Sequence, residues 1–314
     1  MTGNNRITTL SDLAIGNPRT VLNLTIVPLS GNTASAIDYV LIDEALETKK
    51  VMVEEVSEGG SVPELRMTNF SDRIVLVVDG TELVGAKQNR IVNASFLIPP
   101  ESVTKIPVSC VEQGRWRYKD RNFGASRHFS PHSIRRDTAE FHKTTLKQKQ
   151  GYVSDQGKVW ASVADMSHKM DAPTMTGAMN DVMEQKARSI EEYQKGISLE
   201  GRETGAAFFI NGIFRGIDLF DRAATFGKMF PKLISGIAVE AMIADGTRLS
   251  TRRAKTPAEA AAYVKRILDE IGKSLFEKYE PIGVGEDWRY DAKRSFGKAL
   301  HHAGDLIHFS TFGK

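Results

Sequence analysis

The sequence predicts an α+β fold, with an antiparallel β-rich N-terminal half that is sandwich-like or barrel-like. A mixed helix and hairpin C-terminal half is expected to pack on it. Between residues 20 and 113, short segments of alternating apolar and polar residues are separated by turn residues, which is typical of antiparallel sheets. After residue 150, segments of helical spacing are mixed with hairpin signals. We expect a polar leader at 1–18, a β-rich domain at 19–150 and an α+β lobe at 151–314, the last two being separate or one continuous globule.

The N-terminal strands are recognised by alternation and by the turns that end them. Leu22, Leu24 and Ile26 alternate with polar residues, which predicts the first strand. Further strands are expected over VMVEEVSE, VPELRMTNFSD, IVLVVDG, RIVNASFLI and TKIPVSCVE. The pair Asp79-Gly80 predicts a tight hairpin, and the apolar spacing in IDYVLIDEALETKKV predicts a short helix.

The C-terminal half combines helices with hairpins. Helical spacing is found over 176–195, over 222–243 with an interruption expected at Pro231, and after the capping box TPAE at 256–259. The pair Asn211-Gly212 is a strong hairpin signal, and a last hairpin is expected around 303–305.

Composition narrows the class of protein. The 314 residues carry a net charge of +3 and a single cysteine, Cys110, which excludes an internal disulfide and fits a reducing compartment. No apolar run is long enough to span a bilayer, and the N-terminus lacks the features of a signal peptide. We therefore expect a cytoplasmic protein without a membrane partner.

A polar cluster is predicted from side-chain parity on two strands. Val92, Ala94, Phe96 and Ile98 share one face, and the same parity turns Arg90 and Gln88 inward. On the next strand, the inward set of Ile106, Val108 and Cys110 is followed by Glu112. Where these strands end at the same edge, Arg90 and Glu112 are expected to pair, with Gln88 and Cys110 beside them.

Two interpretations of this cluster stay open. A buried ion pair could fix the strand register, or the groups could line a ligand pocket or active site. In the second case Glu112 is the candidate for acid–base chemistry, because a carboxylate at the rim of an apolar face has a raised pKa. The inward parity of Cys110 suits a small core residue better than a nucleophile.

Residues 114–150 form a basic stretch interleaved with aromatic residues. It holds ten Lys or Arg against three Asp or Glu, a net charge of +7. Three interpretations fit: a solvated loop, a site for a nucleotide or diphosphate, and an RNA-binding surface. Nucleic acid is the weaker of these, because the rest of the chain is not basic. The sequence also lacks HExxH, GxGxxG and Walker motifs, so we expect no metal site, and it identifies no cofactor.

Several blocks together resemble one known family. They are DEALE, EGGSVPEL, VVDGTELVGAKQNRIVNASFLIP, PVSCVEQGRW, VWASV, GIDLFD and LIHFSTF. They are similar to the ARG and Rhodanese-Phosphatase-superfamily-associated protein domain family, in which ARG denotes ADP-ribosylglycohydrolase. The likeness runs from about residue 20 to the C-terminus, and its sharpest blocks lie at 85–90 and 109–116. The resemblance implies a role around ADP-ribose and NAD-derived nucleotides by association alone.

Two functions follow as hypotheses. The first is binding or hydrolysis of a nucleotide or phosphorylated small molecule. In it Arg90 and Arg115 hold phosphate, Trp116 stacks on a base, Gln88 and Asn89 orient the ligand beside Cys110, and Glu112 is the catalytic acid or base. The second is a non-catalytic scaffold, as a homo-oligomer, in which the Arg–Glu pair is structural.

Overall fold

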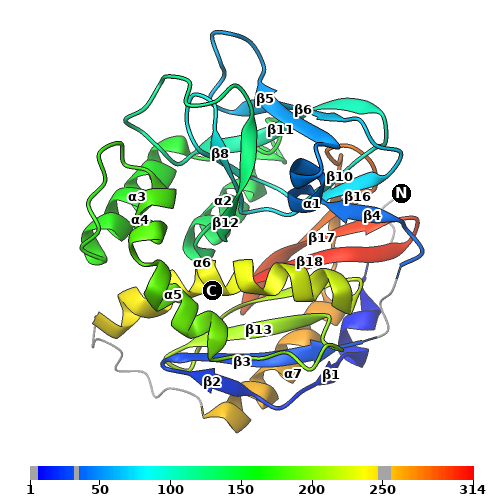
Figure 1. Ribbon diagram of the computed structural model, residues 1–314. Helices are drawn as coiled ribbons and strands as arrows, with labels where there is room; N and C mark the ends of the chain where they lie inside the picture. Colours follow the sequence, from blue (N-terminus) through cyan, green and yellow to red (C-terminus); the bar gives the residue numbers. More distant parts are fainter. Residues whose placement is uncertain (1–5, 32–34, 247–255) are drawn as a thin grey trace. The chain divides into compact units, whose positions relative to one another are not determined.

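The computed structural model describes residues 6–31, 35–246 and 256–314, which fold into two compact units (Figure 1). The terminal unit contains Met1–Ala36, Glu191–Glu280 and Gly285–Lys314, and the middle unit contains Ile37–Ile190 and Pro281–Val284. The mixture of helices and mostly antiparallel strands confirms the predicted α+β class and its β-rich N-terminal half. Among the described residues, no helix combines the length and the apolar character that crossing a bilayer requires.

The terminal unit is built on one nine-stranded antiparallel sheet. Its strands are β1 Ala14–Ile15, β2 Arg19–Val21, β3 Leu24–Ser30, β13 Gly205–Ile210, β14 Ile213–Phe220, β15 Glu277–Tyr279, β16 Glu286–Asp291, β17 Ser295–His302 and β18 Asp305–Gly313. The order is β1-β3-β13-β14-β18-β17-β16-β15, with β2 also paired to β3. The predicted Asn211-Gly212 hairpin joins β13 to β14, and both turn residues have positive φ, as a type I′ turn requires. The last predicted hairpin joins β17 to β18.

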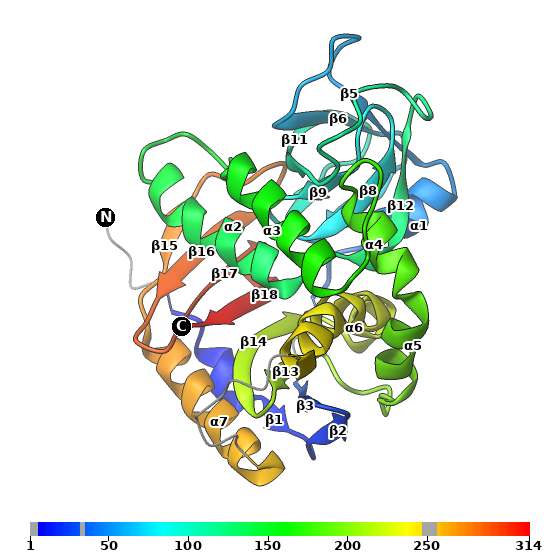
Figure 2. The same cartoon turned by 90° about the vertical axis from the view of Figure 1, so that its left-hand side faces the viewer.

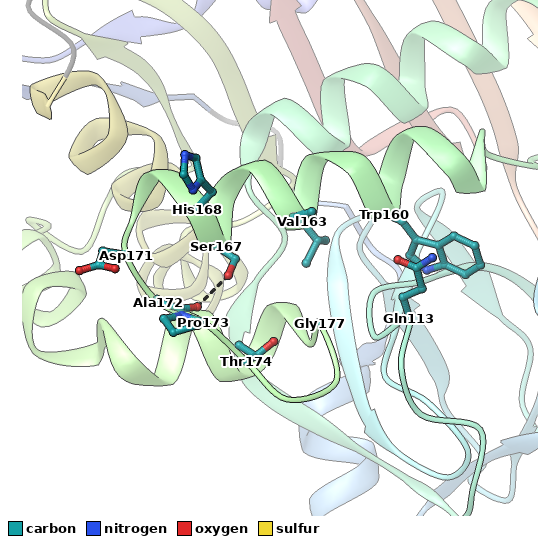
Figure 3. Close-up of a pocket in the computed structure, with 11 residues that line it drawn as sticks. Gln113, Trp160, Val163, Ser167, His168, Asp171, Ala172, Pro173, Thr174 and Gly177 are labelled. Atoms are coloured by element: carbon teal, nitrogen blue, oxygen red, sulfur yellow. Dashed lines mark hydrogen bonds between the residues drawn. The ribbon is translucent and has the colours of Figure 1, made fainter.

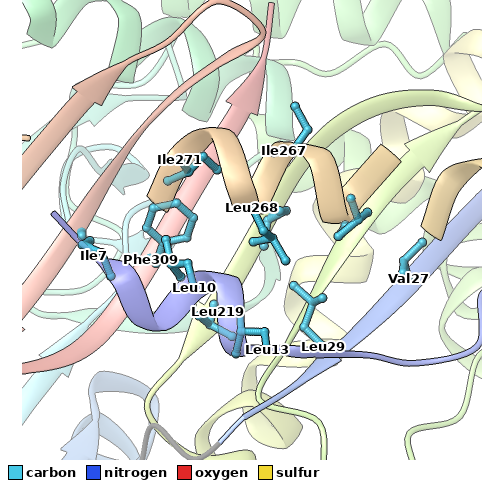
Figure 4. Close-up of a cluster of buried hydrophobic side chains, with 14 of the residues drawn as sticks. Ile7, Leu10, Leu13, Val27, Leu29, Leu219, Ile267, Leu268, Ile271 and Phe309 are labelled. Carbon is cyan, nitrogen blue, oxygen red and sulfur yellow. The ribbon is translucent and has the colours of Figure 1, made fainter. Parts of the chain in front are cut away.

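Helices cover this sheet on both faces (Figures 1 and 2). They are the 3₁₀ helix η1 Thr8–Asp12, α6 Ala223–Gly246 and α7 Pro257–Lys273. Helix α7 begins with the predicted capping box and packs its apolar face on η1 and the sheet, in the cluster of Figure 4. Helix α6 runs through Pro231, so the interruption predicted there is wrong. Burial of Phe230 and Ile234 on either side of the proline holds the helix together.

The pairing of β3 with β13 places residues 24–30 and 205–210 in one unit, and the two compact units divide at residues 37 and 190. Leu24 lies opposite Ile210 in this ladder. The two residues are so far apart in the sequence that no local pattern predicts their pairing. Residues 8–15, which were expected within a polar leader, form η1 and β1 and bury Leu10 and Leu13.

His301 gives the terminal unit a pH-dependent stability. It lies on β17 with its ring centroid 4.2 Å from that of Trp288. Burial lowers its pKa from 6.5 to about 4. In the unfolded chain the imidazole takes up a proton near pH 6.5, whereas in the fold it does so only near pH 4. Stability is therefore fully present above pH 6.5 and falls by about 3 kcal/mol as the pH drops to 4.

Replacing His301 with phenylalanine tests this contribution. We expect urea unfolding of H301F to lose this part of the dependence between pH 6.5 and 4, because phenylalanine keeps the ring contact and does not titrate. An unchanged pH dependence in the variant would assign the effect to other groups.

The middle unit contains a three-stranded and a six-stranded sheet. In spatial order, the strands of the three-stranded sheet are β10 Phe96–Ile98, β7 Ile74–Val77 and β4 Tyr39–Leu41. Those of the six-stranded sheet, also in spatial order, are β12 Phe123–Phe129, β8 Thr81–Gly85, β9 Arg90–Val92, β11 Ser102–Cys110, β6 Glu64–Asn69 and β5 Val51–Glu55. Only the β4–β7 pair is parallel among these. The helices are α1 Ile42–Glu47, α2 His132–Thr145, α3 Gln156–Lys169 and α4 Met179–Gln185, and α5 Ala187–Lys195 leads into the terminal unit.

Three local predictions for this unit are corrected. The segment 90–98 is two strands, because the chain leaves one sheet after Val92 and enters the other at Phe96. Asp79-Gly80 forms a turn between strands of different sheets instead of a hairpin, and its carboxylate bonds Arg135 at 3.0 Å. The helix predicted over 176–195 is divided into α4 and α5 at Lys186.

The basic stretch is more ordered than the predicted loop. Strand β12 and helix α2 occupy much of 114–150, and Phe123 and Phe129 are buried. Arg135 is buried too, in its ion pair with Asp79. These aromatic and basic side chains support the fold, so they are not available to stack on bases or bind phosphates.

Candidate functional site

Strand pairing brings the predicted polar residues together. Arg90 opens β9 and lies opposite Cys110, the last residue of β11. Gln88 precedes β9, and Glu112 follows β11 beyond its end. All four side chains are buried, and Arg90 has no exposed surface at all. The prediction that this amide, guanidinium, thiol and carboxylate belong to one neighbourhood agrees with their placement.

Gln88 organises one side of the Arg90 guanidinium. Its Oε1 accepts hydrogen bonds from Arg90 Nη1 at 3.0 Å and from Cys110 Sγ at 3.1 Å. Its Nε2 donates to the backbone oxygen of Glu112 at 2.8 Å. Cys110 therefore acts as a small buried donor in this network, in agreement with its predicted place in the core.

The other edge of the guanidinium faces Glu55, which is not among the site residues predicted from the sequence. Arg90 Nη2 lies 3.8 Å from Glu55 Oε1. Neither Arg90 Nε nor Nη2 makes a hydrogen bond to the described residues, and neither oxygen of Glu55 does. Burial lowers the pKa of Arg90, against the raising effect of Cys110 and Glu55. A buried guanidinium edge with two donors thus forms a long ion pair with a buried carboxylate, without any hydrogen bond between them.

Parity could have identified Glu55. It ends β5, where Val51, Val53 and Glu55 are buried and alternate with partly exposed residues. This is the same change from apolar to polar side chains on one face that singled out Arg90 and Glu112.

The predicted pair between Arg90 and Glu112 is not formed. Glu112 binds Arg115 instead, through Arg115 Nε at 2.8 Å and Nη2 at 2.6 Å. Its carboxylate also accepts from the backbone nitrogen of Asn89 at 3.0 Å and from Thr176 Oγ1 at 2.9 Å. The reason is local, because Arg115 follows three residues after Glu112 and reaches its carboxylate across the turn.

The raised pKa predicted for Glu112 is also wrong. Burial acts to raise it, but the hydrogen bonds from Arg115, Asn89 and Thr176 together hold the pKa below its ordinary value of 4.5. Glu112 is therefore an ionised acceptor that orders its neighbours.

Arg115 is fully engaged within the protein. Besides Glu112, it donates to the backbone oxygens of Gly85 at 3.1 Å and Ala86 at 2.5 Å, and to Asn89 Oδ1 at 3.2 Å. These bonds tie the segment after β11 to the one after β8. The phosphate contact predicted for Arg115 has no geometric support, since all its side-chain nitrogens are already bonded. Asn89 uses its backbone nitrogen and its Oδ1 in the same network.

Trp116 lies over two cations at the edge of this cluster. Its ring centroid is 5.3 Å from Lys87 Nζ and 5.8 Å from Arg90 Cζ, and Lys87 also lies 5.2 Å from the Tyr118 ring. Trp116 is 47% exposed, so it connects the buried guanidinium with the surface.

The loop between β5 and β6 closes over the same place. Gly60 has φ +77° there, and a Cβ atom at this glycine would lie 3.1–3.3 Å from Trp116, Glu55 and Lys87. Lys87 Nζ donates to the backbone oxygen of Glu58 in this loop. We call Glu55, Lys87, Gln88, Arg90 and Trp116 the Arg90 site, and residues 56–62 its covering loop.

Comparison with known proteins supports one family. The model of the ARG and Rhodanese-Phosphatase-superfamily-associated Protein domain matches residues 12–312. No curated protein and no solved structure matches the chain.

Proposed function

Because the chain belongs to the ARG and Rhodanese-Phosphatase-superfamily-associated Protein domain family, we propose that it binds a nucleotide or another phosphorylated small molecule at the Arg90 site. The family's name links it to enzymes that act around nucleotides and phosphate esters, and this link gives the class of ligand. The residues of the site give the place.

The free edge of Arg90 is the observation that carries the proposal. Nε and Nη2 form the planar fork that matches two oxygens of a phosphate, and neither donor has a hydrogen-bond partner within the described residues. Leaving such donors buried without a hydrogen bond is unfavourable by about 1–3 kcal/mol each. A ligand that supplies the acceptors would remove this unfavourable free energy when it binds.

Lys87 and Trp116 supply the remaining contacts. Lys87 adds a second positive charge close to the fork, and the Trp116 ring offers a face on which a base can stack. Glu55 would repel a fully ionised phosphate. The proposed ligand therefore also presents a hydroxyl, amide or protonated phosphate donor to this carboxylate.

Binding requires the covering loop to move, because Arg90 is fully buried beneath it. The loop is held by the contact of Lys87 with Glu58 and by the close packing of Gly60. A ligand that takes over the Lys87 contact would release the loop. In this proposal Glu112 and Arg115 position the walls of the site, and Glu55 is the carboxylate placed to accept a proton if a bond to the ligand is cleaved.

The scaffold alternative rests on the Glu112 network. Four hydrogen bonds saturate that carboxylate, as expected of a structural ion pair. The Arg90–Glu55 pair differs in having no such bonds. The two halves of the predicted cluster therefore separate into a structural pair and a candidate binding site.

A thermal-shift screen tests the proposal. We expect at least one of ADP-ribose, NAD, cyclic nucleotides or sugar phosphates to raise the melting temperature, since a ligand at 100 times its Kd stabilises by about 2.7 kcal/mol. The variant K87M should lose most of this shift. The matched control K105M removes a lysine that is 70% exposed on β11 and should keep it. An absence of any shift, or equal shifts in both variants, would move the assignment to the scaffold. Chromatography of the best ligand after incubation with the protein separates hydrolysis from binding, because it detects cleavage products whether or not inorganic phosphate is released.

A further inference from the structure

Two half-exposed aromatic side chains meet at Lys87 beside the Arg90 site. Lys87 Nζ lies over the Trp116 ring, 5.3 Å from its centroid, and over the Tyr118 ring, 5.2 Å from its centroid. Both rings belong to the segment between β11 and β12, and each residue is 47% exposed. Two aromatic faces are thus directed at one ammonium group, and a ligand in solution can reach both rings.

The backbone that carries these rings is held by hydrogen bonds. Arg115 Nη1 donates to the backbone oxygen of Ala86 at 2.5 Å and to that of Arg117 at 2.9 Å. The backbone nitrogen of Lys119 donates to the same oxygen of Ala86 at 3.0 Å. The chain is therefore fixed on both sides of Tyr118, and a ligand that binds there has little of the segment left to order.

A nucleobase is the chemical group that suits these rings. Aromatic side chains stack on the faces of bases, and this stacking tolerates any base because every base has a π-face. Trp116 also lies 5.8 Å from Arg90 Cζ, so a base on these rings lies next to the guanidinium edge that is proposed to hold phosphate. A sugar phosphate without a base would leave both rings unused.

We propose that Trp116 and Tyr118 form an aromatic clamp that selects ligands with a nucleobase, and that Lys87 occupies this clamp until such a ligand binds. The inference rests on the proposed function of the Arg90 site and narrows its ligand from phosphorylated small molecules to nucleotides. Cation–π contacts at exposed rings are weak, so a base can displace the ammonium. Lys87 is then free to pair with the phosphate beside Arg90, and Tyr118 determines specificity.

A cavity in the same unit offers the base a different place (Figure 3). Its volume is about 400 Å³, and Trp160 and Ala164 line it from α3. Lys87, Trp116 and Tyr118 are not among its lining residues. A substitution that fills this cavity, A164L, therefore distinguishes the two places.

Isothermal titration calorimetry with adenosine 5′-monophosphate (AMP) and ribose 5-phosphate tests the clamp, because these probes share a phosphate and a ribose and differ in the base. We expect the wild type to bind AMP about 5- to 150-fold more tightly than ribose 5-phosphate. Y118L should lose most of this preference at an unchanged affinity for ribose 5-phosphate, and Y118F, which keeps the ring, should retain it. Two controls should also retain it: A164L, and F70L, which removes a ring that is 57% exposed elsewhere in the middle unit.

Equal affinities of the wild type for the two probes would overturn the clamp and leave the Arg90 site as a general phosphate site. An unchanged preference in Y118L, or an equal loss of affinity for both probes in that variant, would also overturn it. Loss of the preference in A164L would place the base in the cavity instead. Binding of neither probe would overturn the clamp, and it would overturn the proposed function as well if the thermal-shift screen is also negative.

Discussion

Replacing Arg90 with methionine is expected to destabilise the middle unit by about 3–5 kcal/mol. The substitution leaves Glu55 as a buried charge without its ion-pair partner. It also removes the hydrogen bond of 3.0 Å that Arg90 Nη1 donates to Gln88 Oε1. Urea unfolding followed by circular dichroism measures the loss, at constant pH and salt.

The double variant R90M/E55L separates the ion pair from the packing around it. Replacing both partners of a buried pair with apolar groups is commonly neutral or stabilising by about 1–4 kcal/mol. We therefore expect the double variant to recover most of the stability that R90M loses. If it is less stable than R90M, the two charges do not form the energetic unit inferred from their 3.8 Å separation.

Removing the Glu112 carboxylate is the second large change. E112A leaves Arg115 without its ion pair and the backbone nitrogen of Asn89 without its acceptor, so we expect a loss of about 3–5 kcal/mol. The control is E54A, which breaks the more exposed pair with Arg66 and should change stability by less than about 1 kcal/mol. Similar effects of the two substitutions in urea unfolding would contradict the saturated network around Glu112.

The acid dependence of E112A adds a second readout. Because the pKa of Glu112 is lowered in the fold, its contribution is present above the ordinary value of 4.5 and is lost as the pH falls through the lower folded value. The wild type should therefore lose this stability below pH 4.5, and E112A should show a smaller loss over the same range.

The sequence predicted elements that local chemistry specifies. The Asn211-Gly212 turn and the Thr256 capping box have mechanisms that act within a few residues, and both occur where they were predicted. The switch of the chain between two sheets at residues 93–95 and the pairing of β3 with β13 depend on contacts between distant segments. No local sequence pattern predicts these two features.

The candidate site was predicted in part for the same reason. Parity on β11 and the register of Arg90 with Cys110 bring Gln88, Arg90 and Cys110 together. Parity does not determine which carboxylate meets which guanidinium, because that depends on the reach of side chains beyond the strand ends. Glu112 was therefore assigned to Arg90, although Arg115 lies within its reach, and Glu55 was missed although its strand shows the same pattern.

The central claim is that Arg90 and Glu55 are kept for a ligand. It is tested most directly by the thermal shift that the best ligand of the screen produces in the wild type and in R90M/E55L, which is expected to keep its fold. We predict a clear rise in melting temperature for the wild type and none for the double variant. An equal rise in both proteins would show that the ligand binds elsewhere and would contradict the assignment of the Arg90 site.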